Sequence, residues 1–159
     1  MSNPQKRKGS DFERLAVEIL NELIEDSDWK RVPGSGALGT ILGEPILTSD
    51  ILGKVKSIPK SFKVEAKVGY NSSKDKEVKQ FTLKKEWLDK IRMEALQTFS
   101  LPFLIGKFSG AREGTKVFVV MDVQEFASIV NHITKLKNEV DRLSSVTEEF
   151  IKDVKEELK

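Results

Sequence analysis

Two acidic residues and one lysine of this chain have types and spacing that could hold a metal ion and cut a phosphodiester. Asp50 lies fifteen positions before Glu65, and Glu65 opens the triplet Glu65-Ala66-Lys67 at the end of a predicted strand over residues 62–67. Mg²⁺ prefers oxygen ligands and keeps several waters, so one or two carboxylates are enough. Such an ion lowers the pKa of a bound water and stabilises charge on the leaving oxygen. The side chain of Lys67 lies on the same face of the strand as that of Glu65, where its ammonium group would stabilise the negative charge that develops in the reaction.

This pattern by itself does not separate a catalytic site from a charged strand face. The chain has 27 basic and 25 acidic residues, so an acid followed by Glu-x-Lys also arises by chance. A solvated face of a strand would carry the same residue types. Both interpretations stay open until other motifs are considered.

The composition removes several other catalytic chemistries. Among 159 residues there is no cysteine, and the only histidine is His132, in a predicted C-terminal helix. Thiolate zinc sites and cysteine nucleophiles are excluded, and histidine-based triads or zinc sites are poorly supported. No stretch approaches the ~20 apolar residues of a membrane span, and no apolar signal region follows the basic N-terminus. We therefore expect an intracellular protein without a membrane segment.

The net charge of +2 hides an uneven distribution of charge along the chain. Between Lys54 and Lys90 there are eleven lysines and five acids, whereas from Asp122 to Lys159 there are nine acids and six bases. A basic central region indicates a face that binds a polyanion. The alternative is that these lysines only keep exposed strands in solution.

The apolar pattern predicts helices and strands in alternation, which gives an α/β or α+β domain around a mixed sheet. The nearly unbroken apolar run over 101–108 is typical of a central strand buried on both faces. The predicted elements are a flexible basic arm over 1–9, a helix over 10–26, a strand over 29–32, the segment 46–52 that carries Asp50, a turn over 53–59, a strand over 61–68, a short strand over 81–83, a helix over 84–98 with Leu96 facing inward, and strands over 101–108 and 116–121.

The C-terminal segment has a different apolar pattern from the rest of the chain. Asp122 is a predicted helix cap with Glu125 three residues later. From residue 133 apolar residues recur alternately three and four apart, which is heptad spacing. Ser144-Ser145 is a predicted break. We divide the chain into a domain over 10–130 and a helical tail over 131–159, which either packs on the domain or forms a coiled-coil or four-helix dimer contact.

Four motifs then occur in a fixed order. They are Lys8-Gly9-Ser10-Asp11-Phe12-Glu13-Arg14, Arg31-Val32-Pro33-Gly34-Ser35-Gly36-Ala37, Asp50, and Val64-Glu65-Ala66-Lys67. Over about residues 6–121 this order resembles the archaeal-type Holliday junction resolvases, members of the PD-(D/E)XK nuclease superfamily. The resemblance implies a restriction-endonuclease-like α/β fold, a central mixed sheet flanked by helices. It also implies a homodimeric, metal-dependent endonuclease that resolves four-way DNA junctions.

The resemblance implies roles for the residues that match its motifs. Asp50 and Glu65 would ligate Mg²⁺, for which Mn²⁺ would substitute, and the backbone carbonyl of Ala66 would add a ligand. Lys67 would orient or activate the attacking water. Glu13 would complete the acidic cluster and bind the metal through a water.

Further residues are expected at the DNA. Ser35 would contact the scissile phosphate, or it would simply form its loop between two glycines. Arg14 would either contact a phosphate or make a structural salt bridge. The predicted phosphate contacts are Lys6, Arg7, Lys8, Arg14, Arg31, Lys74, Lys76 and Lys79.

Three departures from the resolvase pattern leave alternatives open. Ser49 replaces the proline that precedes the aspartate, and Trp87 stands where many relatives carry a helix glutamine, with Gln80 nearby. The tail lies beyond the usual end of the family. A PD-(D/E)XK nuclease acting on other branched or duplex DNA, and a non-catalytic DNA-binding module, remain alternatives, as do chromosomal, viral and phage origins.

Overall fold

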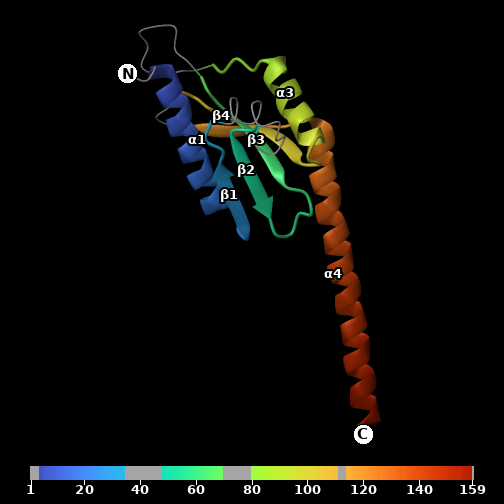
Figure 1. Cartoon of the computed structure of the whole chain (residues 1–159). Helices are drawn as coiled ribbons and strands as arrows, with labels where there is room; N and C mark the ends of the chain where they lie inside the picture. Colours follow the sequence, from blue (N-terminus) through green and yellow to red (C-terminus); the bar gives the residue numbers. More distant parts are fainter. Residues whose placement is uncertain (1–3, 35–47, 70–79, 111–113, 159) are drawn as a thin grey trace. The chain divides into compact units, whose positions relative to one another are not determined.

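The computed structural model describes residues 4–34, 48–69, 80–110 and 114–158. It separates into two compact units, Met1–Asp122 and Val123–Lys159 (Figure 1). The boundary lies eight residues before the predicted start of the tail at residue 131. Among the helices in the described ranges, none is long and apolar enough to cross a membrane.

The first unit is built on a five-stranded mixed sheet in the order β1-β2-β3-β4-β5. Strands β3 and β4 are parallel, and the other neighbouring pairs are antiparallel. A parallel pair needs a crossover connection, which α3 (Lys85–Leu96) supplies. The α/β fold with a central mixed sheet is thus confirmed. The strands are β1 (Ser27–Arg31), β2 (Ile51–Val55), β3 (Phe62–Val68), β4 (Leu101–Lys107) and β5 (Val117–Val120).

Helix α1 (Pro4–Leu23) covers one face of this sheet. Its buried residues Phe12, Ala16 and Leu20 are four apart, as a single apolar stripe requires. The helix begins six residues before the predicted start, so residues 4–9 are helical where a flexible arm was expected. Proline suits the first helical position because its missing N–H would have no partner there.

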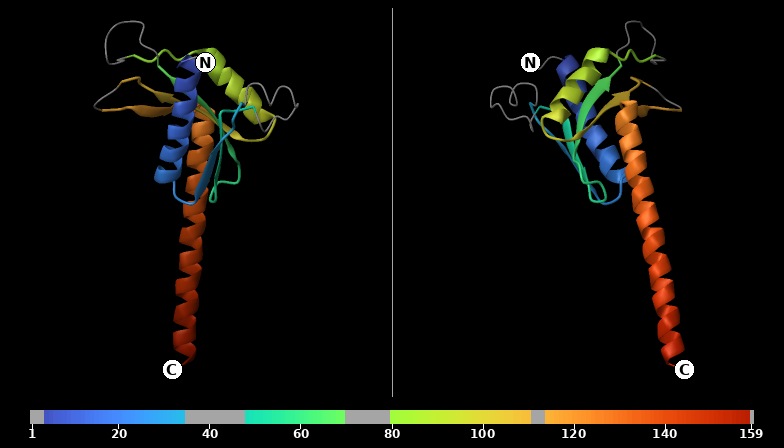
Figure 2. Two further views of the ribbon diagram at one scale, coloured as in Figure 1. Left: turned by 60° about the vertical axis from the view of Figure 1, so that its left-hand side comes forward. Right: turned by 90° about the vertical axis from the view of Figure 1, so that its right-hand side faces the viewer.

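The two helices of the first unit lie on opposite faces of the sheet (Figure 2). Arg31 pairs with Glu13 of α1. Arg31 is opposite Ile51 in β2, and Ile51 is opposite Val64 in β3, so these three side chains lie on the α1 face. Successive strand residues point to opposite faces. Glu65 therefore points the other way, where it pairs with Lys90 of α3.

An aromatic cluster on the α1 side explains why a glycine lies within β2. Trp29 packs against Phe62 and Phe103 at centroid distances of 5.3 and 5.9 Å. Gly53 lies between Trp29 and Phe62 in the register, and a Cβ there would collide with the Trp29 ring. The turn or hairpin connection predicted over 53–59 therefore begins later than expected, because β2 runs through this glycine to Val55.

Two further predictions around α3 are wrong. Residues 81–83 form no strand, because Phe81 instead joins Trp87, Phe108 and Phe118 in an aromatic cluster on the α3 side. Leu96, expected to face inward, is 60% exposed at the end of α3.

The second unit is one continuous helix, α4 (Val123–Glu157), which starts directly after the predicted cap residue Asp122. The predicted break at Ser144-Ser145 is wrong. Ser145 Oγ donates to the carbonyl of Asp141 at 3.1 Å, and Thr147 Oγ1 donates to that of Leu143 at 2.8 Å. These bonds to the preceding turn keep the hydroxyls from competing for the helix backbone.

Candidate active site

Of the two predicted metal-binding acids, Asp50 lies directly before β2 and Glu65 lies within the neighbouring strand β3. In the register Ile51 is opposite Val64, so the preceding residue Asp50 is opposite Glu65 on the α3 face. Residues paired in this way have Cβ atoms roughly 4.5–5.5 Å apart. Asp50 Oδ2 accepts the backbone N–H of Ala66 at 2.9 Å, which fixes the carboxylate beside β3. Burial, followed by the nearby charge of Glu65, raises the pKa of Asp50 above its ordinary value.

Ser49 holds the backbone that presents Asp50. Its side chain is fully buried, and its Oγ donates to the carbonyl of Ile51 at 3.2 Å. The carbonyl of Asp50 accepts the N–H of Val32 at 2.9 Å. The serine thus anchors the entry to β2 where the resolvase pattern has a proline, and the aspartate keeps its place on the sheet.

Glu65 is held between two lysines. Its side chain is only 3% exposed. Lys67 Nζ donates to Oε1, and Lys90 Nζ donates to Oε2 at 3.0 Å. Both oxygens of this carboxylate therefore face ammonium groups, one from its own strand and one from α3.

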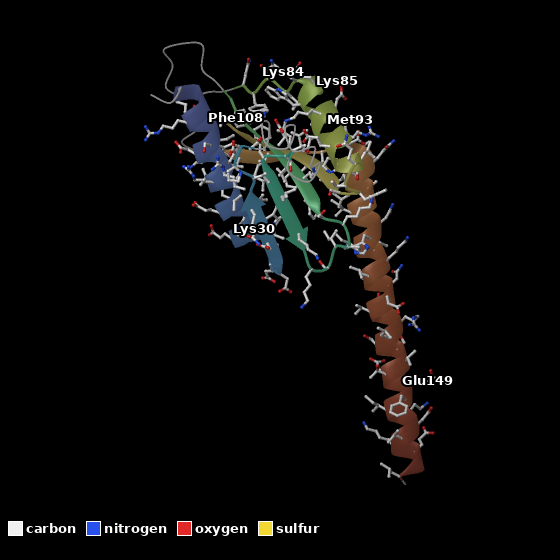
Figure 3. The ribbon with its side chains drawn as sticks, viewed as in Figure 1. Lys30, Lys84, Lys85, Met93, Phe108 and Glu149 are labelled. Carbon is white, nitrogen blue, oxygen red and sulfur yellow. The ribbon has the colours of Figure 1, made fainter. Side chains whose placement is uncertain are left out.

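Trp87 braces the catalytic lysine candidate from the other side. Lys67 Nζ lies 5.6 Å from the centroid of the Trp87 ring, within range of a cation–π contact. Lys84 lies at 5.5 Å from the same ring, just before α3 (Figure 3). Trp87, which the sequence analysis placed where relatives carry a helix glutamine, contacts Lys67 through its ring. Gln80 is exposed and precedes the helix, so it does not fill that place either.

Three charged residues of the site were missed by the sequence analysis: Lys63, Lys90 and Glu94. Lys63 is fully buried and donates to Thr48 Oγ1 at 3.0 Å. Burial lowers its pKa, and the charge of Glu94 opposes that shift. Lys90 lies 3.8 Å from Glu94. Two signals in the sequence could have found them. Strand alternation places Lys63 on the same face as Glu65 and Lys67. Lys90 and Glu94 are four residues apart, which makes them neighbours on a helix.

Burial and opposite charge compete at these residues. Burial lowers the pKa of Lys90, but the charge and hydrogen bond of Glu65, together with the charges of Glu94 and Asp50, outweigh burial and raise that pKa. Burial raises the pKa of Glu94 against the opposing effect of Lys90. Glu94 Oε2 is buried without a hydrogen-bond partner. Three carboxylates thus gather with three lysines where the strands β2 and β3 meet α3.

Glu13 and Arg31 pair with each other across α1 and β1. Arg31 Nε lies 2.5 Å from Glu13 Oε2, and both side chains are mostly buried. The charge of Glu13 still reaches Asp50, whose pKa it helps to raise. Across the described ranges, no three or more acidic, histidine or cysteine side chains gather as a metal site. In this structure Glu13 therefore pairs with Arg31 and acts on Asp50 through its charge.

Comparison with known proteins identifies the family to which the chain belongs. A family model described as "Phage putative PDDEXK endonuclease" matches residues 4–158. The chain belongs to this family. A solved structure of Hjc, a Holliday junction resolvase from the archaeal hyperthermophile Archaeoglobus fulgidus, is similar with 16% identity and a TM-score of 0.41, over 73% of this chain and 85% of that one. No curated protein matches the chain.

Family membership confirms the prediction of a PD-(D/E)XK nuclease. Nucleases of this type act on DNA and generally use a divalent metal. Assignment to the archaeal-type resolvases stays a prediction.

The donor set of this PDDEXK endonuclease fits a hard divalent cation. Asp50 and Glu65 have carboxylate oxygens for this purpose, and Ala66, between Glu65 and Lys67 in the sequence of β3, would add a backbone carbonyl. One or two carboxylates suffice for Mg²⁺, which keeps several waters. The mutual repulsion that raises the pKa of Asp50 is the kind of interaction that a bound cation relieves.

The remaining predicted residues are spread over several regions. Arg14 pairs with Asp11 at 3.0 Å on the exposed side of α1, which is the structural salt bridge weighed above. Arg7 and Lys8 are exposed on α1. Lys6 belongs to α1, but its side chain is not among those described. Ser35, Lys74, Lys76 and Lys79 lie outside the described residues.

Proposed function

We propose that this PDDEXK endonuclease resolves four-way DNA junctions by metal-dependent hydrolysis, leaving paired symmetric nicks. The observation that carries the proposal is the pair of Asp50, bonded to β3 directly before β2, and Glu65 within β3, with Lys67 held on Glu65. The order of the four motifs supports the choice of a junction over other DNA. The proposed products are 5′-phosphate and 3′-hydroxyl ends.

In this proposal Asp50, Glu65 and the carbonyl of Ala66 hold Mg²⁺, with Mn²⁺ as a substitute. When bound, the ion would lower the pKa of water and stabilise charge on the leaving oxygen. Lys67 orients the attacking water and faces the developing charge. Its contacts with Glu65 and Trp87 fix the ammonium group in advance, so little reorganisation is needed at the reaction.

The remaining predicted residues support the metal site or hold the DNA. Glu13 adds negative charge near Asp50, and Ser35 contacts the scissile phosphate. The basic residues around α1 and the segment 70–79 contact phosphates of the junction arms. Phosphate contacts position DNA without reading its bases, so binding should weaken steeply as salt rises.

A four-way junction presents two symmetry-related strands, and a C2 homodimer presents two active sites. Pairing of two subunits is therefore part of the proposal. The phage family supports action inside the host cell, where such junctions form during recombination and repair.

The test is Mg²⁺-dependent cleavage of a synthetic four-way junction beside linear duplexes made from the same arms. Asp50→Asn and Glu65→Gln should abolish cutting. Asp89→Asn and Glu86→Gln make the same chemical changes on exposed positions of α3 and should leave cutting intact. Paired nicks in the junction alone, lost only in the first two variants, would establish the activity.

Other outcomes choose between the alternatives. Equal cutting of junction and duplex would keep the nuclease and reject junction selectivity. Junction binding without any cutting, together with no Mg²⁺ site by calorimetry, would favour a non-catalytic DNA-binding module.

A further inference from the structure

The second unit carries a long apolar stripe that the proposed active site does not use. Large apolar side chains recur every three or four residues along α4, and they are exposed in their own unit. Ile133, Val140 and Phe150 are 58%, 60% and 67% exposed. Because α4 is continuous through residues 144–145, the stripe runs along one helix from Phe126 to Val154, with Thr147 at one of its positions.

We propose that this stripe is the seam of a parallel, two-stranded coiled coil with α4 of a second copy of the chain. Spacing of three and four assigns every stripe residue to one of two core positions of a heptad. The first core position, a, holds Ile133, Val140, Thr147 and Val154. The second core position, d, holds Leu136, Leu143 and Phe150.

The residue types at these positions select the number and direction of the strands. β-branched residues at a, combined with leucine at d, favour a parallel dimer. The a row is β-branched at all four of its positions from Ile133 to Val154, and d is leucine at Leu136 and Leu143. A second copy of the same helix satisfies this seam by itself, because each row meets its own equivalent.

The charges that flank the seam distinguish parallel from antiparallel pairing. The flanking row before each a position carries Glu125, Glu139 and Asp153. The opposite flanking row, after each d position, holds Lys137 and no acid. Parallel pairing sets the acidic row against the acid-free row, whereas antiparallel pairing sets acids against acids. Like charges brought together across an interface cost free energy, so the charge pattern favours the parallel arrangement.

Parallel pairing has a consequence for cleavage that rests on the proposed function. The nuclease unit ends at Asp122, directly before α4. Two parallel helices would therefore join two nuclease units at the same end of the coil. Both active sites would then be available to one junction, as two symmetric cuts require.

The absence of cysteine from the chain makes a direct test possible, since any introduced thiol is the only one. In the full-length protein, Ile133→Cys and Val154→Cys place thiols at the a position in distant heptads. Asn138→Cys places one on the helix face opposite the seam. Under mild oxidation the first two should each form a disulfide-linked dimer with high yield, and the third should not. Light scattering of the unmodified chain should give the mass of a dimer.

Each other result overturns a defined part of the inference. A monomer without cross-links overturns the coil, as expected if the stripe were covered within its own chain or by another protein. A mass above the dimer overturns the two-stranded state. If the Ile133→Cys and Val154→Cys variants form cross-links only when the two proteins are mixed, the parallel direction is overturned. No DNA is involved, so a dimer that does not cut junctions rejects the proposed function alone, and a monomer that cuts them rejects the coil alone.

Discussion

At the scale of single residues, the site is organised around one buried carboxylate held by two cations. Glu65 receives Lys67 from its own strand and Lys90 from α3. Removing one partner of a buried charge pair leaves the other charge poorly compensated. The two lysines therefore fix the direction of Glu65, which is the carboxylate expected to meet the metal.

We predict that Lys90→Met slows single-turnover cleavage at saturating Mg²⁺ by about 10–100-fold, the usual effect of losing a group that orients a metal ligand. Lys85→Met is the matched control, because Lys85 is exposed at the start of α3, where it pairs with Asp89 (Figure 3). Lys90→Arg should recover part of the rate, since it restores a cation. Equal rates for the two methionine variants would show that Lys90 does not position Glu65.

Asp50 should lower the stability of the metal-free protein at neutral pH. Burial and the charge of Glu65 raise its pKa in the folded state above the ordinary value of 3.8. The folded state then holds the proton more tightly than the unfolded state, so the contribution of Asp50 to stability falls as pH rises above 3.8. Asp50→Asn removes this charge while its amide oxygen can still accept the N–H of Ala66.

In EDTA at neutral pH, we therefore predict a higher urea midpoint of unfolding for Asp50→Asn than for the unsubstituted protein. At low pH the difference between these two midpoints should become smaller. Mg²⁺ should raise the free energy of unfolding of the unsubstituted protein by about 2.7 kcal/mol at one hundred times its dissociation constant, and should have little effect on that of the variant. Asp89→Asn, on the exposed side of α3, is the control. A lower midpoint for Asp50→Asn in EDTA would contradict the argument.

At the scale of elements, β2 depends on a glycine that local sequence preferences misrepresent. Gly53 was assigned to a turn because glycine is unfavourable inside strands. It lies in the strand because the ring of Trp29, from the neighbouring strand, fills the space above it. A contact between residues distant in the sequence decides this position, so no local pattern could have predicted it.

We predict that Gly53→Ala destabilises the protein by about 1–3 kcal/mol, the cost of forcing extra volume into a packed core. Gly9→Ala is the matched control, because Gly9 lies in α1 and a Cβ there meets nothing within 4 Å. It should stabilise the protein by roughly 0.5–1 kcal/mol, since alanine is the better helix residue. Urea unfolding of both variants measures the two effects, and a neutral Gly53→Ala would mean that Trp29 moves without cost.

The contrast between predicted and missed site residues has the same origin. Asp50, Glu65 and Lys67 were found because a motif fixes their order and because strand alternation fixes their faces. Lys90 was missed because its contact with Glu65 joins a helix to a strand 25 positions away, and no motif marks it. The aromatic cluster at Phe81 likewise replaced a predicted strand through side chains from three other segments.

At the scale of the whole molecule, cutting both strands of one junction should depend on the pairing of two copies of the chain. Neither unit by itself supplies both: the first carries the acids and lysines, and the second carries the seam. If α4 pairs two copies, the second nick can follow the first before the junction is released. A monomer would have to leave and return, which lets a singly nicked product accumulate.

We predict this difference for a supercoiled plasmid with an extruded cruciform, in which two paired nicks give linear DNA and one nick gives an open circle. Leu136→Glu combined with Leu143→Glu places acids at two successive d positions of the coil, where burying unpaired charge breaks the coil. Asn138→Glu combined with Ser145→Glu adds the same charge with the same spacing on the opposite helix face. At saturating protein the first pair should give open circles and the control pair linear DNA, although both make the first nick at the same rate. Linear product from a protein shown to be monomeric would break the link between the coil and paired cleavage.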